Sequence, residues 1–312
     1  MNTKTTPWKM VILLSATATA SYICRVNVST AGPLLMKEFS LSQVAMGRVF
    51  SAFLLGYALF QVPAGMLADK WGAPKILGWA AWFWVALTVI QSLTGWGPFQ
   101  LQDGFALPLF LFLRFLLGVT ESPTFPGAAK GVSQWVAPQF RGRANGMVIG
   151  AIGLGSALAP PLVSNIMVHW GWRMALVVSA IPALIMAIIW RKLKMPANND
   201  KHLHFTATLL TSESTAAING ESSKSIDDAE KAGAIEESSP IKESSAAIPF
   251  RITTPSFILL TISYSLQGYV GYIFVSWFYI YLVQERHFGL LSGAWMSSLP
   301  WILSIISIPL GG

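Results

Sequence analysis

The stretch Val62-Pro-Ala-Gly-Met-Leu-Ala-Asp-Lys-Trp-Gly72 is a short charged turn between two long apolar segments. Gly65 lets two helices approach closely, and Gly72 permits a sharp change of chain direction. Asp69, beside Lys70, can accept hydrogen bonds from a neighbouring helix N-terminus or pair with a basic residue, and either contact would lock one conformation. The stretch therefore predicts a membrane hairpin, in which a polar loop joins two apolar helices.

The composition of the whole chain agrees with a membrane protein. Of its 312 residues, 53% are apolar and 11% are charged, whereas soluble chains carry about 25% charged residues. Most of the 14 acidic residues lie between Asp200 and Glu243, so the net charge of +7 does not indicate nucleic-acid binding. The single cysteine excludes a disulfide framework, and the four histidines suggest no metal site. Because no catalytic constellation is visible either, we expect neither a cofactor nor an enzyme.

Long apolar stretches recur along the chain. A membrane helix needs about 20 mostly apolar residues to cross about 30 Å of hydrocarbon, and no segment shows the alternation of a barrel strand. The first stretch begins too late and runs too long for a cleaved signal peptide. We therefore predict an all-α integral membrane protein. Its predicted spans cover about 9–33, 44–67, 75–95, 106–129, 144–167, 173–193, 254–282 and 292–312.

One long segment separates the first spans from the last two. Residues 196–250 are rich in Ser, Ala and acidic residues, which is typical of a disordered linker. The chain thus divides into an N-terminal bundle over 1–195, this linker, and two spans within 251–312. Most of the 21 basic residues fall on the side of the membrane that holds the N-terminus and the linker, so we expect both in the cytoplasm. The basic residues expected on the opposite side are Lys37, Arg48, Arg173 and Arg286.

The charged turn and the order of the spans resemble the major facilitator superfamily. The loop signature of that superfamily is Gly-x-x-x-Asp-Arg/Lys-x-Gly, which residues 65–72 match, although Ala73 and Pro74 replace the usual basic residues after it. The resemblance implies the major facilitator fold, in which each half is a six-helix bundle. The chain would then hold the N-terminal six-helix bundle and the first two helices of an incomplete C-terminal bundle.

The last span supports an internal repeat. Its end, Ile308-Pro-Leu-Gly-Gly312, places a proline and a glycine at the same spacing as Pro63 and Gly65. If the two halves are repeats, four further helices would be expected after this point. We therefore expect a chain that is truncated after helix 8.

Further motifs resemble the anion:cation symporter family within that superfamily. Arg114-Phe-Leu-Leu-Gly-Val-Thr-Glu-Ser-Pro-Thr-Phe-Pro126 follows the family pattern Arg-x3-Gly-x2-Glu-x-Pro-x2-Pro of helix 4. The resemblance covers nearly the whole chain apart from the linker, and it implies uptake of organic anions, including sugar acids such as hexuronates, glucarate and galactonate, usually with protons. The other matching stretches are Arg25-Val-Asn27, Gly56-Tyr-x3-Gln-x-Pro63, Arg141-Gly-Arg-Ala144, Gly171-Trp-Arg173 and Ser276-Trp-Phe-Tyr-Ile-Tyr-Leu282.

Three ionisable residues, Arg25, Arg114 and Glu121, lie deep within predicted spans. A charge at the bilayer centre costs about 3 kcal/mol or more, so such residues mark a pathway or a partner. Arg114 and Glu121 share one helix face at a separation of about 10 Å, which is too far for a direct pair. Each should therefore face across the bundle toward Arg25. Two arginines and one carboxylate would leave a net positive cavity that attracts an anion, and the alternative is a purely structural Arg–Glu tie between helices.

These residues suggest distinct roles. We expect Arg25 and Arg114 to clamp the carboxylate of the substrate, because a guanidinium binds a carboxylate through two parallel hydrogen bonds. Glu121, desolvated but close to cations, is expected to be the proton-coupling group. On the family resemblance Tyr22 and Tyr57 face the central cavity, where their hydroxyls would bind a polyol; packing between helices is the alternative.

Two other positions leave alternatives open. Many family members have Asp at the position of Cys24, so either Glu121 carries the coupling alone or the coupling ion or stoichiometry differs, and the thiol itself can pack as a small apolar group. Tyr272, Trp277 and Tyr281 line the other side of the cavity or belong to an interfacial aromatic belt.

The sequence as a whole favours a proton-linked organic-anion symporter with alternating access. We expect a multi-pass protein of the cell inner membrane whose partners are protons, a small organic anion and the lipid bilayer, and which is a monomer when complete. An inactive fragment or a membrane scaffold that lacks helices 9–12 is the alternative, because alternating access needs two bundles around a shared site.

Overall fold

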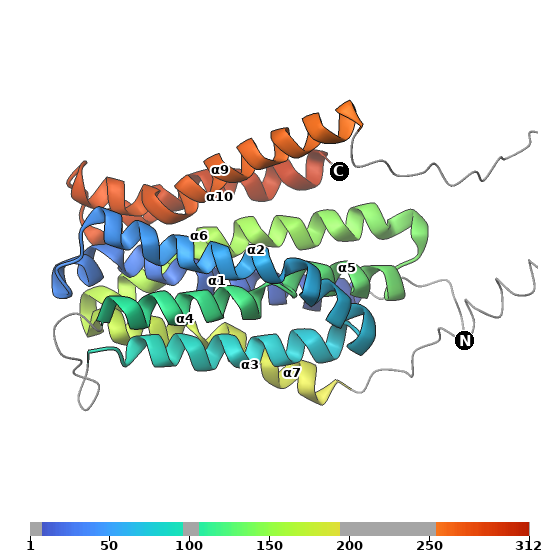
Figure 1. Cartoon of the computed structure of the whole chain (residues 1–312), viewed down its shortest axis with the longest axis horizontal. Helices are drawn as coiled ribbons and strands as arrows, with labels where there is room; N and C mark the ends of the chain where they lie inside the picture. The colour runs from blue at the N-terminus through green and yellow to red at the C-terminus, as the bar shows by residue number, and fades with distance from the viewer. Residues whose placement is uncertain (1–7, 96–105, 194–253, 312) are drawn as a thin grey trace, which may run out of the picture. The chain divides into compact units, whose positions relative to one another are not determined.

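The computed structural model describes residues 8–95, 106–193 and 254–311, except for the side chains of Ile306 and residues 308–311. All regular structure in these residues is helical, which confirms the all-α prediction. Residues 8–193 and 264–311 form one compact unit, whereas residues before Tyr264 in the last-but-one helix belong to a second unit. The helices, labelled in Figure 1, are α1 (Trp8–Glu38), α2 (Gln43–Trp71), α3 (Ala73–Ser92), α4 (Ala106–Glu121), α5 (Thr124–Trp135), α6 (Arg141–Ser179), α7 (Ile181–Lys192), α9 (Pro255–Gln284) and α10 (Leu290–Gly311), with a 3₁₀ turn at Pro138–Phe140.

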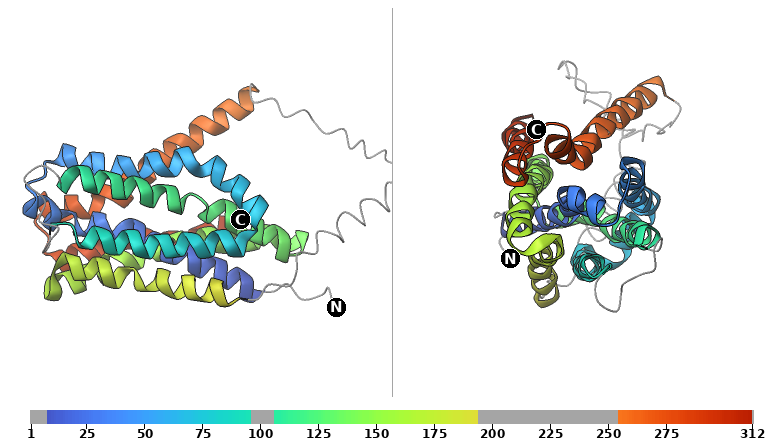
Figure 2. Two further views of the ribbon diagram at one scale, coloured as in Figure 1. Left: turned by 60° about the horizontal axis from the view of Figure 1, so that its bottom comes forward. Right: turned by 90° about the vertical axis from the view of Figure 1, so that its left-hand side faces the viewer.

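The helices of the first 193 residues run side by side along the long axis (Figure 2). Six helical stretches of the described residues are long and apolar enough to cross a membrane. One of them, Pro138–Lys192, holds two predicted spans, because the chain reverses within α6 at Gly171, where φ is 78° and ψ is 166°. A φ of this sign strains any residue that has a Cβ, so glycine is needed at this turn.

Contacts with α1 show the reversal directly. Before Gly171 the two helices run in the same direction, because Thr19 donates to the carbonyl of Ala151 and Ile23 packs on Ala159 farther along both helices. After it the direction is opposite, since Trp172 donates to Glu38 at the end of α1, whereas Trp190 on α7 donates to Thr17 near its start. The hairpin places both of its arms against α1.

Proline interrupts the predicted span at 106–129. The span becomes α4, which ends at Glu121, and α5, which begins at Thr124 after Pro123. Proline supplies no backbone N–H, so the ladder of helical hydrogen bonds stops there. The break leaves Glu121 at the very end of α4 rather than in the middle of a continuous helix.

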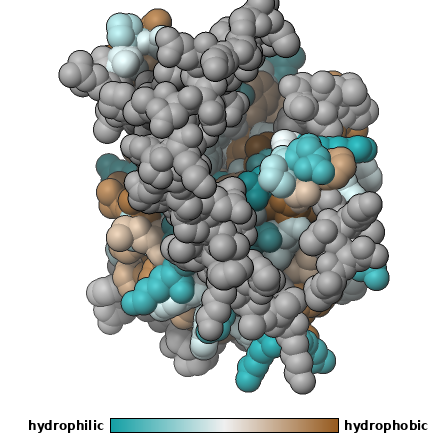
Figure 3. Space-filling view, turned by 90° about the vertical axis from the view of Figure 1, so that its right-hand side faces the viewer, coloured by the Kyte–Doolittle hydropathy of each residue, from teal (hydrophilic) through white to brown (hydrophobic). Residues whose placement is uncertain are grey.

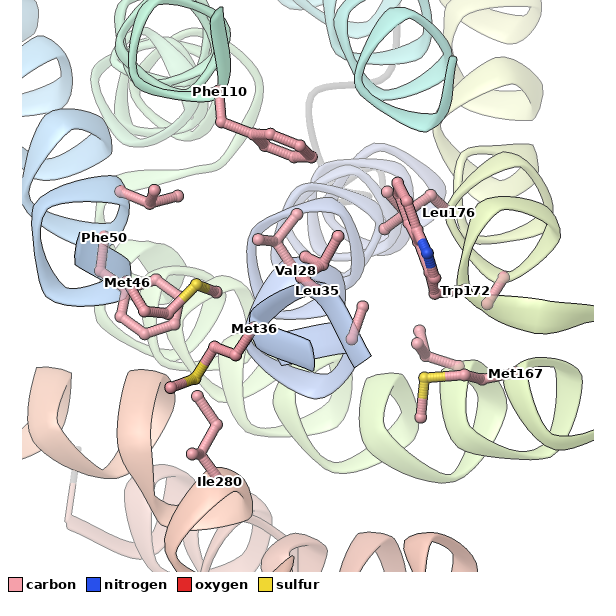
Figure 4. Packing of buried hydrophobic residues seen from close by; sticks show 14 of the residues in the cluster. Val28, Leu35, Met36, Met46, Phe50, Phe110, Met167, Trp172, Leu176 and Ile280 are labelled. Carbon is pink, nitrogen blue, oxygen red and sulfur yellow. The ribbon is translucent and has the colours of Figure 1, made fainter. Parts of the chain in front are cut away.

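Helix α1 lies at the centre of the apolar core. Figure 4 shows Val28, Leu35 and Met36 of α1 surrounded by side chains from the neighbouring helices. Phe50 of α2 and Phe110 of α4 pack on one side. The remaining members of the cluster include Met46, Met167, Trp172, Leu176 and Ile280, so α6 and α9 also contribute. Because α1 is enclosed in this way, polar groups on its middle turns are removed from lipid.

Helices α2 and α4 approach so closely that only glycine fits between them. A Cβ at Gly56 would collide with the backbone oxygen of Phe115, and one at Gly118 would collide with that of Phe53 and lie 2.8 Å from the nitrogen of Tyr57. The glycine pair therefore brings the backbones of α2 and α4 into contact. This contact sets the distance between the side chains that the two helices present to α1.

We expect Gly118→Ala to lower the stability of the detergent-solubilised chain. The new methyl group meets backbone rather than a movable side chain, and overpacking of this kind costs about 1–3 kcal/mol. Gly146→Ala is the matched control, because a Cβ there meets nothing within 4 Å and alanine is the better helix former by up to about 1 kcal/mol. Thermal unfolding followed by circular dichroism measures both, and an equal midpoint for Gly118→Ala and the unchanged chain would contradict the expectation.

Candidate functional site

A buried ion pair joins α1 to α4. The Nε and Nη2 atoms of Arg25 donate to one oxygen of Glu121, Oε2, at 3.0 and 2.9 Å. The hydroxyl of Ser21, one turn earlier on α1, donates to the same oxygen at 3.0 Å. Both charged side chains are almost completely buried, at 2% and 0% exposed. The pairing across the bundle agrees with the expectation that Glu121 faces Arg25.

Aromatic rings enclose the guanidinium of Arg25. Its central carbon lies 4.4, 4.9 and 4.7 Å from the ring centres of Tyr22, Phe53 and Tyr57. Its Nη1 donates to the hydroxyls of Tyr22 and Tyr272 at 3.1 and 3.3 Å. A cation over an aromatic face is attracted by the ring quadrupole, and more strongly in the absence of water. Arg25 is therefore held in one position by contacts from α1, α2, α4 and α9.

Arg114 has a different environment. Its Nη2 donates to the backbone oxygen of Arg25 at 3.2 Å, and its central carbon lies 5.1 Å from the ring centre of Phe53. Its Nε and Nη1 are buried and have no hydrogen-bond partner among the described residues. No carboxylate of that part of the chain is within ion-pair distance of it. Arg114 thus keeps two donor groups and its full charge for another partner.

A small pocket opens beside the two arginines. Its wall includes Arg25 and Ser29 of α1, Arg114 of α4, and Tyr272 and Ser276 of α9, and the apolar residues Phe50, Phe53, Leu54 and Val275 complete it. The charges at the site sum to a net positive value, since one carboxylate balances only one of the two guanidinium groups. A buried positive site with free donors suits a carboxylate or another small anion.

The other predicted residues lie around this site. Tyr22 is buried, and its hydroxyl accepts from Arg25, while Tyr57 is half-buried and stacks on Phe53 at 6.1 Å. Tyr272 reaches the site from α9, whereas Trp277 packs on Phe50 and Tyr281 is exposed. The structure thus brings the two tyrosines and both arginines together with Glu121.

Cys24 points away from the pocket. Its thiol lies 3.8 Å from the backbone oxygen of Ser179, and the side chain packs with Ala81, Leu87 and Ala183 of α3 and α7. This position agrees with the interpretation of Cys24 as a small packing residue. It also shows that α1 has two polar sides, one toward α9 with Arg25 and one toward α3 with Cys24.

Sequence reasoning missed two members of the site. Phe53 contacts both arginines, and Ser21 binds Glu121. The signal for both was helical spacing, because Ser21 lies one turn before Arg25 and Phe53 lies one turn before Tyr57. A phenylalanine and a serine within apolar spans are too common to attract notice without the geometry.

The charged turn lies between the end of α2 and the start of α3, away from the buried arginines. Asp69 pairs with Lys130 of α5 at 3.1 Å, and both side chains are accessible to solvent. Gly72 adopts a φ of 79°, which fits the predicted sharp turn, and Gly65 faces Pro126, 3.7 Å from the position of a Cβ. Lys70 is exposed. Figure 3 shows this end of the molecule, where hydrophilic residues, in teal, lie between apolar ones.

Two transporters of Bacillus subtilis are similar in sequence to this chain. The sequence is 29% identical over 310 residues to a probable galactarate/D-glucarate transporter of Bacillus subtilis, covering 98% of this chain and 64% of that protein. It is 26% identical over 305 residues to a hexuronate transporter of the same organism, covering 97% of this chain and 63% of that protein. The chain therefore spans less than two thirds of the length of these relatives, which are named transporters rather than enzymes.

Solved structures show the same fold. A bacterial homologue of the human lysosomal transporter Spinster, described as inward-facing and unoccupied, matches with a TM-score of 0.68 at 18% identity, over 98% of this chain and 61% of that protein. The sequence profile described as Major Facilitator Superfamily matches residues 14–312. With its apolar helices, its glycine-bounded charged turn and this match over nearly its whole length, the chain belongs to the major facilitator superfamily of membrane transporters.

Proposed function

We propose that this chain carries organic anions of the sugar-acid class across a membrane by proton symport, with alternating access to the site between α1, α2, α4 and α9. The single observation that carries the proposal is Arg114, which is buried within a span, lines the pocket and has no acidic partner in the described residues. An uncompensated buried charge is costly, and an anionic substrate supplies the missing partner. The printed functions of the relatives, galactarate, glucarate and hexuronate transport, favour the same substrate class.

The two arginines play unequal parts in this proposal. Arg114 has two unpaired donor groups, Nε and Nη1, which point in different directions, so each can donate to a separate acceptor oxygen of an anion. Arg25 is engaged by Glu121 and completes the clamp only when that contact weakens. Tyr22 and Tyr57, which lie against Arg25, then supply hydroxyls to the hydroxyl groups of the sugar acid.

Glu121 links the proton to the anion. A proton on Glu121 removes the negative charge that competes for Arg25, so a protonated site binds an anion more tightly. By linkage, a bound anion also raises the affinity of the site for the proton by the same factor. The charged and titratable neighbours of Glu121 in the described residues are Tyr22, Cys24 and Arg25 of α1 and Arg114 of α4. Tyr57 of α2 and Tyr272 of α9 lie against Arg25.

The remaining parts of the proposal concern placement. We place the N-terminus and the segment 196–250 in the cytoplasm and the protein in the cell inner membrane, which puts Asp69 inside and Glu38 outside. The Asp69–Lys130 bridge then joins the loop at Gly65–Gly72 to α5 on the cytoplasmic side. In this proposal the bridge opens when the site changes from facing one side of the membrane to facing the other.

We expect Arg114→Lys to weaken binding of D-glucarate to the purified chain by roughly tenfold to a hundredfold. Lysine keeps the charge but loses the fixed, separately directed N–H donors of the guanidinium, and a charge-assisted hydrogen bond contributes about 1.5–3 kcal/mol. Isothermal titration calorimetry measures the affinity. Arg143→Lys is the control, since Arg143 is exposed and lies against Trp8. Equal affinity of Arg114→Lys and the unchanged chain would remove Arg114 from the site, and no binding by the unchanged chain would favour a scaffold.

We expect Glu121→Gln to make glucarate binding independent of pH. In the unchanged chain affinity should rise as the pH falls, because protonation of Glu121 frees Arg25, and the neutral glutamine should hold the affinity at its low-pH value. Binding measured between pH 5 and 8 tests this. Glu121→Gln should also exchange substrate across vesicle membranes but lose the accumulation that a pH gradient drives. If the variant still accumulates substrate at the normal rate, Glu121 is a structural partner of the arginines.

A further inference from the structure

The buried face of α3 changes character halfway along its length. Toward the Asp69 end it carries Leu77, Ala80, Ala81 and Trp84, and toward the Glu38 end it carries Thr88, Gln91 and Ser92, followed by Thr94 in the turn after the helix. All four polar residues are 1% exposed. Their spacing puts the three helical ones on one side of α3. A polar strip therefore begins in the middle of the bundle and runs to the Glu38 end.

Most oxygens of this strip lack a partner. Thr88 Oγ1, Gln91 Oε1 and Thr94 Oγ1 are buried and accept no hydrogen bond from the described residues, and the same holds for Asn27 Oδ1 on α1. The amide nitrogens of Gln91 and Asn27 each donate one hydrogen bond, to Leu87 O at 3.2 Å and to Ser179 Oγ at 2.9 Å. A buried unpaired polar atom costs about 1–3 kcal/mol, and in folded proteins internal water satisfies such atoms.

Helix spacing arranges the residues that carry these atoms in a line toward the Glu38 end. The hydroxyl of Thr88 faces the thiol of Cys24, to which it can donate, and Cys24 is the neighbour of Arg25 in sequence. Asn27 lies one turn beyond Cys24, and Gln91 lies one turn beyond Thr88. Since α1 and α3 both run from the Asp69 end to the Glu38 end, these two steps lead in the same direction.

The line has a different group at each end. At the Glu38 end, the backbone oxygen of Thr94 accepts from Arg173 at 3.0 Å, and Arg173 is bound to the partly exposed Glu38. At the inner end, Oε1 of Glu121 is buried and unpaired within the described residues, because every contact of that carboxylate is made by Oε2.

Apolar packing closes the line in the other direction. Trp84 is fully buried, and its indole nitrogen donates to the backbone oxygen of Thr120 at 2.9 Å, directly before Glu121. Ala80 and Ala81 of α3 pack there with Ala183 and Ala187 of α7. This packing separates the polar strip from the Asp69 end of the bundle.

The pocket side of α1 is closed toward the Glu38 end. Trp277 packs edge-on against Phe50 with ring centres 5.4 Å apart, and Ile280 lies so near Gly32 that a Cβ there would be 2.7 Å from it. Ser29 donates to the backbone oxygen of Val275 at 3.0 Å. In this conformation the pocket and the polar strip therefore lie on opposite sides of α1. Toward the Glu38 end the pocket side is packed, whereas the strip side carries unpaired polar groups among the described residues.

We propose that the polar strip holds a file of water molecules along the unpaired oxygens of Thr88, Gln91 and Thr94 and of Asn27 on α1. This file conducts protons from the Glu38 end to Glu121, separately from the path of the anion. A proton enters from bulk water at the Glu38 end, is passed along the hydrogen-bonded waters, and is taken up by Oε1 of Glu121, which changes from carboxylate to carboxylic acid. The inference rests on the proposed function for the role of Glu121 as proton acceptor.

The test measures how fast deuterium replaces the proton on Glu121 in the purified chain. The carbonyl stretch of a protonated carboxyl group shifts in D₂O. The band that disappears in Glu121→Gln is the one that belongs to Glu121. The double variant Thr88→Val, Gln91→Leu keeps the side-chain volumes and removes both unpaired acceptors. We expect it to exchange at least about tenfold more slowly, which corresponds to a barrier higher by about 1.4 kcal/mol.

Ser92→Ala is the matched control. Ser92 lies on the same face and is equally buried, but its hydroxyl already donates to Val89 O at 2.7 Å, so the exchange rate should not change. Single variants Thr88→Val and Gln91→Met replace the double variant if it fails to fold, and each should also slow exchange. Unchanged exchange in all of these variants would overturn the proposal and assign proton entry to the pocket.

The outcomes separate the route from the proposed function. Glucarate binding by the Thr88 and Gln91 variants should stay normal, because neither residue touches the pocket. Loss of binding in the unchanged chain would contradict anion transport and leave the exchange rate as a separate result. If no band that depends on Glu121 titrates, then Glu121 takes up no proton, and both the coupling and the route are wrong.

Discussion

The contact on which the site depends is the ion pair between Arg25 and Glu121, buried in a bundle that is otherwise apolar. Removing two charges from water is expensive, and their attraction offsets that cost only if further hydrogen bonds surround them. Ser21 on one side and the tyrosine hydroxyls on the other provide those bonds. Removal of one partner of such a pair typically costs about 3–5 kcal/mol, so the helices that carry it are tied to one another.

The pair also determines what the second arginine can do. Oε2 of Glu121 accepts two hydrogen bonds from Arg25 and one from Ser21, so among the described residues Arg114 has only a backbone carbonyl as its hydrogen-bond partner. A guanidinium remains charged under all physiological conditions. The site therefore has a built-in preference for a negative ligand, and its strength depends on whether Glu121 is ionised.

Much of this arrangement follows from the sequence. The length and hydropathy of the spans predict their number and order, and the charged turn at 65–72 places the ends of α2 and α3. The scarcity of ions within spans singles out Arg25, Arg114 and Glu121, since each is too costly to occur there without a partner.

What the sequence leaves open is the partner: only the packing of α1 against α4 shows that Glu121 binds Arg25 and not Arg114. The reversal at Gly171 falls between the predicted spans 144–167 and 173–193, whereas the break at Pro123 divides the predicted span 106–129, because a local backbone conformation decides it. Only helical spacing from Tyr57 signals Phe53, and nothing in the sequence signals the unpaired Oε1 of Gln91, because both roles arise from neighbours distant in the chain.

The break at Pro123 separates α4 from α5, so α5 can tilt about this residue while α4 stays in place. Glu121 lies before Pro123, at the end of α4, and is paired with α1. Lys130 lies after it, about 9 Å along α5 from Thr124 at a rise of about 1.5 Å per residue. A tilt of α5 by about 20° would move Lys130 by about 3 Å, which is comparable to its 3.1 Å contact with Asp69. The same tilt leaves the end of α4 where it is. The bundle is thus able to release the Asp69–Lys130 bridge while the buried ion pair keeps its geometry, so a small rotation at Pro123 is enough to break a contact farther along α5.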